Sequence, residues 1–130
     1  MSNSETLHQR DVFAEVTGEV AVIGFVSRIF QKYEADDFRM LLNRLRARSI
    51  RQYVIDLSGC DYVSSEGLGA TAQCWKWCHD EGNGRMAVVL PSQADHEVRN
   101  LFDIIGLSRT IGSAIQPTID DARAYLLAFG

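Results

Sequence analysis

The sequence predicts a single α/β domain built around a mostly parallel β-sheet. Three observations predict it: apolar runs at 53–57 and 86–90, helical apolar periodicity in the segments around them, and a length of 130 residues. Strands that alternate with helices are usually joined by parallel crossovers, and single domains most often have about 100–150 residues. We expect the order β-β-α-β-α-β-α-β-α in one domain over residues 12–130, after a loosely ordered polar leader over 1–11.

The first half of this domain predicts a hairpin, a helix and a buried strand. Residues 12–25 are rich in apolar and β-branched types and are interrupted at 17–19, as in two strands joined by a turn. After a connection at 27–33, a helix is expected from about Glu34 to Arg48, because its apolar residues recur at helical spacing: Phe38, Leu41, Leu42 and Leu45. The run at 53–57 is apolar nearly throughout, which is typical of a strand covered on both faces.

The second half predicts three more helices and two more strands. A turn at 58–61 and the pair 62–63 lead into a helix that ends near Glu81, before the glycines of 82–84. After the strand at 86–90, Ser92 is expected to cap a helix whose apolar face contains Val98, Leu101, Phe102 and Ile105 and which ends at Gly106. A short strand is expected over 110–115. Thr118 is then expected to cap a last helix that faces inward with Ala122, Tyr125, Leu126 and Phe129.

Composition excludes several classes of protein. Hydrophobic residues make up 46% and charged residues 23% of the chain, which is the balance of a globular protein. The net charge of −4 argues against nucleic acid as a partner, because such proteins usually carry a clustered basic excess. No apolar run reaches the roughly 20 residues of a spanning helix, so we expect no direct membrane insertion. Three cysteines without framework spacing indicate a reducing, cytoplasmic location.

The search for catalytic, metal-binding and cofactor-binding motifs gives no candidate. A relay of Ser65 and Asp56 lacks a base, since none of the three histidines has a suitable context. Cys74 and Cys78 share a helix face but His79 does not, so we expect two buried thiols and no metal site. The chain is therefore predicted to be neither an enzyme nor a cofactor-binding protein.

The most informative segment is Ser64–Gly69, which follows a strand and opens a helix. Its simple interpretation is structural: a serine hydroxyl caps a free backbone N–H group, and Glu66 interacts favourably with the helix dipole. Its functional interpretation is a phosphoacceptor, because a phosphoryl group here would meet unpaired N–H groups and would add nearly two negative charges to the surface.

The stretch IDLSGCDYVSSEGLG at 55–69 resembles the strand-to-helix motif of the STAS family, in particular its single-domain bacterial anti-sigma-factor antagonists. The later stretches HEVRNLFDIIGLSRTIG and PTIDDARAYL resemble the closing helix–strand–helix of that family. The resemblance extends over about 12–128 and implies a STAS-like fold. In the family the motif reads Asp-Ser-Ser/Thr-Gly-Leu-Gly, and the serine after the aspartate is phosphorylated.

Alignment on Gly67, Leu68 and Gly69 puts Ser65 at the acceptor position, with Ser64 as second choice. Ser64 stands where the family has Asp, and Glu66 stands where it has Ser or Thr. Glu66 would add like-charge repulsion to a phosphoserine at position 65. Asp56 and Asp61 are expected to support the loop by hydrogen bonding, with a Mg²⁺ position as the alternative.

The resemblance implies a partner switch. The unphosphorylated chain would bind an anti-sigma factor with serine kinase activity, phosphorylation of Ser65 would release it, and a serine phosphatase would reset it. The alternative is a constitutive STAS interaction module, a scaffold or an accessory subunit of a signalling or lipid-transport complex. The departures from the family motif at Ser64 and Glu66 favour this alternative. The short single domain and the intact Ser65-x-Gly67-Leu68-Gly69 favour the switch.

Apolar residues cover an unusually wide arc of the helix that starts at Leu68. Trp77 lies at the far edge of that arc. It is expected either to pack against the chain's own first helix or to form an exposed anchor for a partner or for a second copy in a homo-oligomer, because tryptophan is enriched at binding hot spots.

Overall fold

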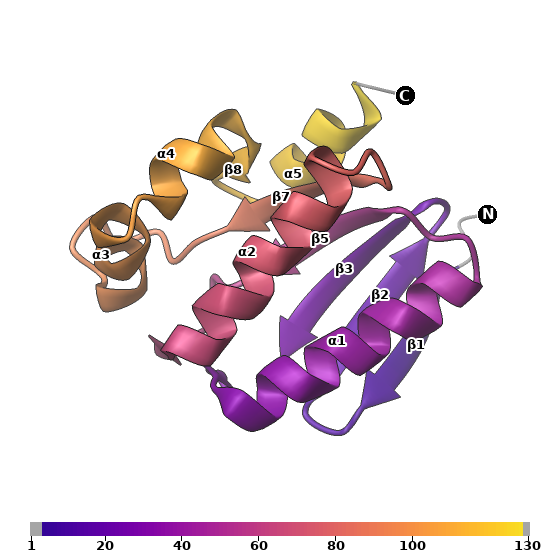
Figure 1. Ribbon diagram of the computed structural model, residues 1–130, viewed down its shortest axis with the longest axis horizontal. Helices are drawn as coiled ribbons and strands as arrows, with labels where there is room; N and C mark the ends of the chain where they lie inside the picture. Colours follow the sequence, from indigo (N-terminus) through magenta and orange to yellow (C-terminus); the bar gives the residue numbers. More distant parts are fainter. Residues whose placement is uncertain (1–3, 129–130) are drawn as a thin grey trace.

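The computed structural model describes residues 4–128, which form a six-stranded sheet with helices on both faces (Figure 1). The strand order is β1-β2-β3-β5-β7-β8. Strands β3, β5, β7 and β8 are parallel neighbours, whereas β1 and β2 join the β3 edge as antiparallel strands. The bounds are β1 Ser4–Gln9, β2 Val12–Thr17, β3 Val20–Phe25, β5 Gln52–Asp56, β7 Arg85–Val89 and β8 Ile115–Gln116.

Helices divide unequally between the two faces of the sheet. The larger core lies under α1 (Lys32–Ala47), α2 (Ser65–His79), α3 (Glu97–Ile104) and α4 (Leu107–Ile111). A smaller core lies under α5 (Ile119–Leu127) on the opposite face, where Ala122 and Leu126 meet Val54 and Ala87. Figure 1 shows α1 and α2 lying side by side across one face of the sheet. The central strands are therefore covered on both faces, as the apolar run at 53–57 predicts.

A separate two-stranded ladder aligns the starts of α1 and α2. The short strand β4 (Ile29–Phe30) leads into α1 and pairs in parallel with β6 (Tyr62–Val63), which leads into α2. The ladder continues into the helix start, where the Ser64 N–H donates to the Phe30 carbonyl at 2.9 Å. Two strand-to-helix junctions therefore lie next to each other at the carboxyl edge of the parallel strands.

Most of the predicted elements are confirmed. The hairpin turns at Gly18, which has a φ of +61°, and the helix predicted from Glu34 begins two residues earlier, at Lys32. The predicted terminal cap is also present, since Thr118 Oγ1 accepts from the Asp121 N–H at 3.0 Å. Phe129, predicted to face inward, lies outside the described residues.

The expectation of a loosely ordered leader over 1–11 is wrong for Ser4–Gln9, which form the edge strand β1. Leu7 is its single buried side chain, and the rest of the strand is polar and exposed or half-buried. Arg44 of α1 donates to the His8 carbonyl at 2.6 Å, and Arg48 forms an ion pair with Glu5. Tertiary contacts therefore order a segment whose composition is typical of a free terminus.

The predicted strand over 110–115 is also wrong. Residues 107–111 form α4 and 112–114 form a 3₁₀ turn, so that only Ile115 and Gln116 join the sheet. Gly106 adopts a φ of +81° at the junction of α3 and α4. This left-handed conformation changes the direction of the chain after α3. The β-branched residues that follow then form a second short helix and not a strand.

The sequence predicted that Ser92 caps α3, and this prediction is wrong. The helix begins five residues later, at Glu97, and its cap is His96, whose Nδ1 accepts from the Val98 N–H at 3.1 Å. In the described residues, 4–128, every helix is too short or too polar to cross a bilayer.

Candidate functional site

The six residues of the Ser64–Gly69 motif lie where β6 passes into α2, at the carboxyl edge of the parallel strands. Ser64 is the residue before the helix, with an extended backbone, and Ser65 is the first helical residue. The motif is therefore at a sheet edge where loops from several strands meet. Ligand and partner sites in α/β proteins commonly occur at such edges.

Ser64 is the helix cap. Its Oγ accepts from the Gly67 N–H at 3.3 Å and lies 3.4 Å from the Phe30 carbonyl oxygen, to which it can donate. Its own carbonyl accepts the first helical hydrogen bond, from the Leu68 N–H at 2.9 Å. Ser64 is half-buried, so this hydroxyl is engaged in local structure.

Ser65 occupies a different environment from Ser64. Its side chain is exposed, and the capping of α2 does not depend on it. The structural interpretation of the motif therefore applies to Ser64, and the Ser65 hydroxyl is accessible from solvent. An exposed hydroxyl at the positive end of a helix has the accessibility that a modifying enzyme requires.

Glu66 follows Ser65 and is fully exposed. Hydrogen bonds from the Ser64 hydroxyl, from its own backbone N–H and from Ser65, together with the positive charge of Lys32, lower the pKa of its carboxyl group. Glu66 is therefore an anion at neutral pH, beside the Ser65 hydroxyl.

The two glycines of the motif have unequal roles. A Cβ atom on Gly67 would lie 2.3 Å from the Phe30 carbonyl oxygen and 2.9 Å from the side chain of Val63, whereas a Cβ atom on Gly69 would meet nothing within 4 Å. Gly67 thus permits the close approach of α2 to β4 and β6. Gly69 is free of that constraint and borders a groove.

This groove runs along α2 from Ser65. It has a volume of about 370 Å³ and is lined by Ser65, Leu68, Gly69, Ala72, Ile105 and Leu107. The four α2 residues recur at helical spacing, Ile105 is the C-cap residue of α3, and Leu107 is the first residue of α4. Apart from Ser65, the lining is apolar. We call it the Ser65 groove.

Ile104 and Ile105 are exposed beside the groove, a position that the sequence pattern did not predict for either residue. Ile105 was expected in the buried face of α3, but it is 49% exposed, and Ile104 is 79% exposed. Two consecutive isoleucines before a helix-ending glycine cannot both face the core, and this was the signal available in the sequence. Together they extend the apolar surface beside the Ser65 groove.

Asp56 and Asp61 support the neighbouring loops. Asp56 Oδ1 accepts from the backbone N–H of Ser58 at 3.0 Å and from its hydroxyl at 2.5 Å. Asp61 receives two hydrogen bonds of 3.1 Å from Arg28, which lower the pKa of its carboxyl group. Both carboxylates therefore form hydrogen bonds within or between the loops at this edge of the sheet.

Trp77 is half-buried at the α1–α2 contact. The Arg46 guanidinium lies 3.9 Å from the centroid of its ring, and the Tyr53 ring lies 6.2 Å away. Trp77 thus packs against the chain's own first helix, one of the two roles that the sequence left open. Trp75 is also half-buried and stacks on His79 at 3.6 Å.

The cysteines are buried thiols. A hydrogen bond with Cys78 and burial raise the pKa of Cys74, and burial raises the pKa of Cys60 to about 12. Within residues 4–128, no group of three or more His, Cys, Asp or Glu side chains could hold a metal ion. None of the hydrogen bonds in this range joins Ser65 to a histidine.

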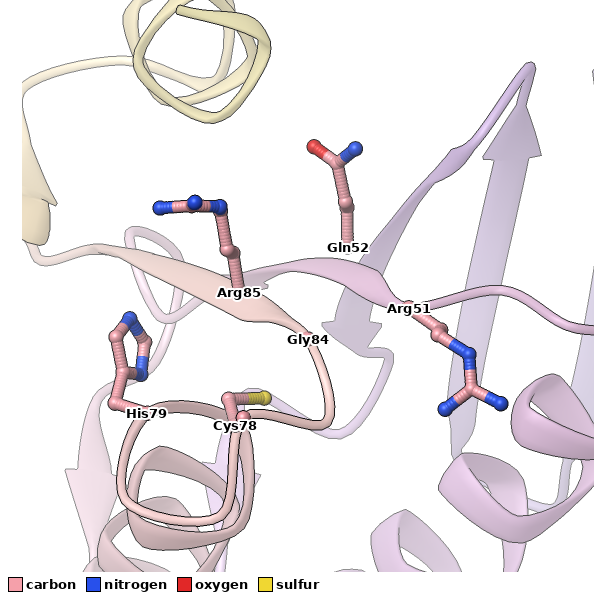
Figure 2. A pocket seen from close by; sticks show the side chains of 7 residues that line it. Arg51, Gln52, Cys78, His79, Gly84 and Arg85 are labelled. Atoms are coloured by element: carbon pink, nitrogen blue, oxygen red, sulfur yellow. The ribbon is translucent and has the colours of Figure 1, made fainter. Parts of the chain in front are cut away.

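A second cavity of about 370 Å³ lies at the other end of α2, lined by Arg51, Gln52, Cys78, His79, Gly82, Gly84 and Arg85. Figure 2 shows Arg85 and Gln52 projecting to one side of the strand pair and Arg51 to the other. The two guanidinium groups therefore do not converge on one ligand position.

Two solved structures have a similar fold. A crystal structure of a candidate anti-sigma factor antagonist from Thermotoga maritima matches with a TM-score of 0.70 and 18% identity, over 88% of this chain and 92% of that chain. The murine solute carrier 26 family member A9, an anion transporter, matches with a TM-score of 0.67 and 19% identity. That match covers 98% of this chain but only 22% of the transporter. These matches establish similarity of fold.

No curated protein matches the sequence at a significant level. A model of the STAS domain family matches residues 12–122, which is most of the chain. This match agrees with the resemblance carried by the strand-to-helix motif at 55–69. On the evidence of the family match and of the shared fold, the chain belongs to the STAS domain family.

Proposed function

We propose that this chain is an anti-sigma-factor antagonist that acts by partner switching, with Ser65 as the switch. The observation that carries the proposal is the position of the Ser65 hydroxyl: exposed, not needed as a cap, and at the rim of an apolar groove. The unphosphorylated chain binds an anti-sigma factor with serine kinase activity, and this docking frees a sigma factor. The chain is the substrate of the kinase and has no catalytic residue of its own.

The switching chemistry needs only the Ser65 hydroxyl from this chain. Its Oγ attacks the γ-phosphorus of ATP held by the kinase, the bond to the β-phosphate oxygen breaks, and the hydroxyl proton leaves to a base on the kinase or to water. Phosphoserine and ADP result. A phosphatase later hydrolyses the ester bond with one water molecule, which restores the hydroxyl and releases inorganic phosphate. The phosphoryl group adds nearly two negative charges at the docking surface, which favours dissociation.

The Ser65 groove supports docking at this surface. Ala72 and Ile105 supply apolar surface that a partner could bury beside the buried Leu68 and Leu107, and the exposed Ile104 extends it. The fold similarity to a candidate anti-sigma factor antagonist over nearly its whole length favours the same class of partner. The cytoplasm, where sigma factors act, is the corresponding location.

A second candidate function is a constitutive interaction module. It is favoured by the fold match to part of an anion transporter and by the two motif departures, Ser64 and Glu66. In such a module the same groove would hold a permanent partner, and Ser65 would stay unmodified.

Pull-downs from the native cytosol test the two functions, with wild type, Ser65→Glu and Ser65→Ala as baits and mass spectrometry as the readout. We expect wild type and Ser65→Ala to retain an ATPase-fold kinase and Ser65→Glu to lose it. Addition of ATP should release wild type but not Ser65→Ala.

Ser92→Glu is the matched control, because Ser92 is exposed on the loop after β7 and lies outside the groove. It adds the same charge and should bind like wild type. If Ser65→Glu and wild type retain the same partner equally well, the switch is excluded and the chain is a constitutive module.

A further inference from the structure

The starts of α1 and α2 are aligned by the β4–β6 ladder. Ile29 pairs with Tyr62 and Phe30 with Val63, so the same register carried forward puts Gln31 opposite Ser64 and Lys32 opposite Ser65. The hydrogen bond from the Ser64 N–H to the Phe30 carbonyl continues the ladder into this region. Lys32 and Ser65 are the first residues of the two helices, which pack against each other.

The Lys32 ammonium group already acts on this helix start. Its positive charge contributes to the lowered pKa of Glu66, the residue next to Ser65. Lys32 takes part in none of the three ion pairs of residues 4–128. The Lys32 ammonium group therefore acts on the Glu66 carboxylate over a distance longer than that of an ion pair. Its side chain is exposed and can reorient.

Several other charged groups around the start of α2 have specific partners. Arg28 holds Asp61, and the Glu34 carboxylate accepts from the Gln31 N–H at 2.9 Å. On the α3–α4 side, Asp103 Oδ1 accepts from the Ser108 hydroxyl, and the Nδ1 atom of His96 accepts from Val98. Lys32, the cation whose charge acts on the neighbouring Glu66, is therefore the cation best placed to meet a new anion at Ser65.

We propose that Lys32 is the positioning residue for phosphorylated Ser65 and that it exchanges Glu66 for the phosphoryl group when Ser65 is modified. The proposal rests on the proposed function, in that it takes Ser65 as the phosphoacceptor. Before modification, Lys32 offsets the charge of Glu66. After modification, the phosphoryl group carries more charge than a carboxylate and attracts Lys32 more strongly than Glu66 does. Glu66 and the phosphoryl group repel each other.

The second ionisation of the phosphoryl group reports these interactions directly. Its ordinary pKa is about 6. Lys32 favours the dianion and lowers this pKa, and Glu66 disfavours the dianion and raises it. For charges about 8 Å apart in water at an ionic strength of about 0.02 M, the effect of each is about 0.3 unit.

The test uses the full chain with phosphoserine genetically encoded at position 65, followed by ³¹P NMR across a pH titration. We expect Lys32→Gln to raise the phosphoserine pKa by about 0.3 unit and Glu66→Gln to lower it by a similar amount. Both shifts should shrink at 0.5 M salt. Circular dichroism checks that each variant folds as wild type does.

Lys76→Gln and Asp80→Asn are the charge-matched controls at the far end of α2, eleven or more residues and therefore about 16 Å or more from Ser65. They should shift the pKa by less than half as much. If Lys32→Gln shifts it no more than Lys76→Gln does, only net charge matters, and the proposed role of Lys32 is wrong.

This measurement is independent of any kinase or partner. Failure of the pull-down would leave the ³¹P result standing as a property of the chain. Failure of the ³¹P test beside a successful pull-down would remove Lys32 from the mechanism and leave the partner switch intact.

Discussion

Adjacent serines at the start of α2 have different environments, and the difference is measurable. Ser64 caps the Gly67 N–H, whereas Ser65 is exposed and takes no part in capping. We expect Ser64→Ala to lower the free energy of unfolding by about 1 kcal/mol and Ser65→Ala to change it by less than about 0.5 kcal/mol. Urea denaturation measures both values. Equal losses would mean that Ser65 shares the cap and is less available for modification.

Gly67 and Gly69 provide a second paired comparison. In Gly67→Ala the new methyl group would lie 2.3 Å from the Phe30 carbonyl oxygen, so α2 must move away from β4. Overpacking of this kind costs about 1–3 kcal/mol. Gly69→Ala has open space and gains helix propensity, so it should stabilise the fold by up to about 1 kcal/mol. Thermal unfolding of the two variants should therefore shift in opposite directions.

A stabilised Gly67→Ala variant would contradict this packing. It would mean that the first turn of α2 can separate from β4 at no cost, and that the alignment of Lys32 with Ser65 is loose.

At the residue scale, the sequence predicted the position of the Ser64–Gly69 motif but not the residues that surround it in the fold. The start of α2 could be located from Ser64 to Gly69, because a capping residue and a preceding strand are local signals. Ile105 could not be identified as a neighbour of Ser65 in the groove, and the alignment of Lys32 with Ser65 follows only from the pairing of β4 with β6. Residues that lie far apart in sequence join a site through sheet register and helix packing, which local patterns do not encode.

Elements with strong periodicity were predicted, and elements ordered by tertiary contacts were not. The helix at 32–47 and the strands at 52–56 and 85–89 follow from their apolar spacing. Strand β1 has one buried residue in six, a pattern that also fits a disordered terminus. The β-branched residues near Thr110 favour a strand, but Gly106 and burial of Leu107 and Ile111 turn them into a helix. Tertiary packing overrode propensity in both cases.

The contact between α1 and α2 is expected to depend on Trp77, and this can be tested by its effect on stability. Trp77 packs between Arg46 and Tyr53, so Trp77→Ala should lower the free energy of unfolding by about 2 kcal/mol, while the affinity for the proposed kinase partner stays within about twofold. A double-mutant cycle with Arg46→Ala should give a coupling of about 0.5–1 kcal/mol.

Lys76→Ala, one residue away and exposed, is the control and should change stability by less than about 0.5 kcal/mol. The opposite result, unchanged stability with weakened binding, would make Trp77 an interface anchor.

Charged groups of both signs lie at the carboxyl edge of the parallel strands, with Ser65. Asp56, Asp61, Glu66, Asp95 and Glu97 lie there together with Arg28 and Lys32. Opposite charges that lie close together offset each other at a distance. Long-range repulsion is therefore a weak explanation for the proposed release by one further phosphoryl group.

Desolvation in the Ser65 groove is the stronger explanation. Docking would press Ser65 and the apolar residues Leu68, Ala72 and Ile105 against the partner and remove water from them. A hydroxyl tolerates this loss if it finds one hydrogen bond, whereas a charged group loses a much larger hydration free energy. Salt screens charges across water but cannot restore this lost hydration.

The two explanations predict different salt dependence for Ser65→Glu. Between about 0.1 M and 1 M salt the screening length falls from about 10 Å to about 3 Å, so repulsion across solvent would largely disappear. If desolvation governs release, the ratio of wild-type to Ser65→Glu affinity, measured by titration calorimetry against the purified partner, should change by less than about threefold. Ser65→Gln, which is bulky, polar and neutral, should lose part of the affinity at every salt concentration. Recovery of Ser65→Glu binding at high salt would instead locate the release mechanism in charge repulsion across solvent.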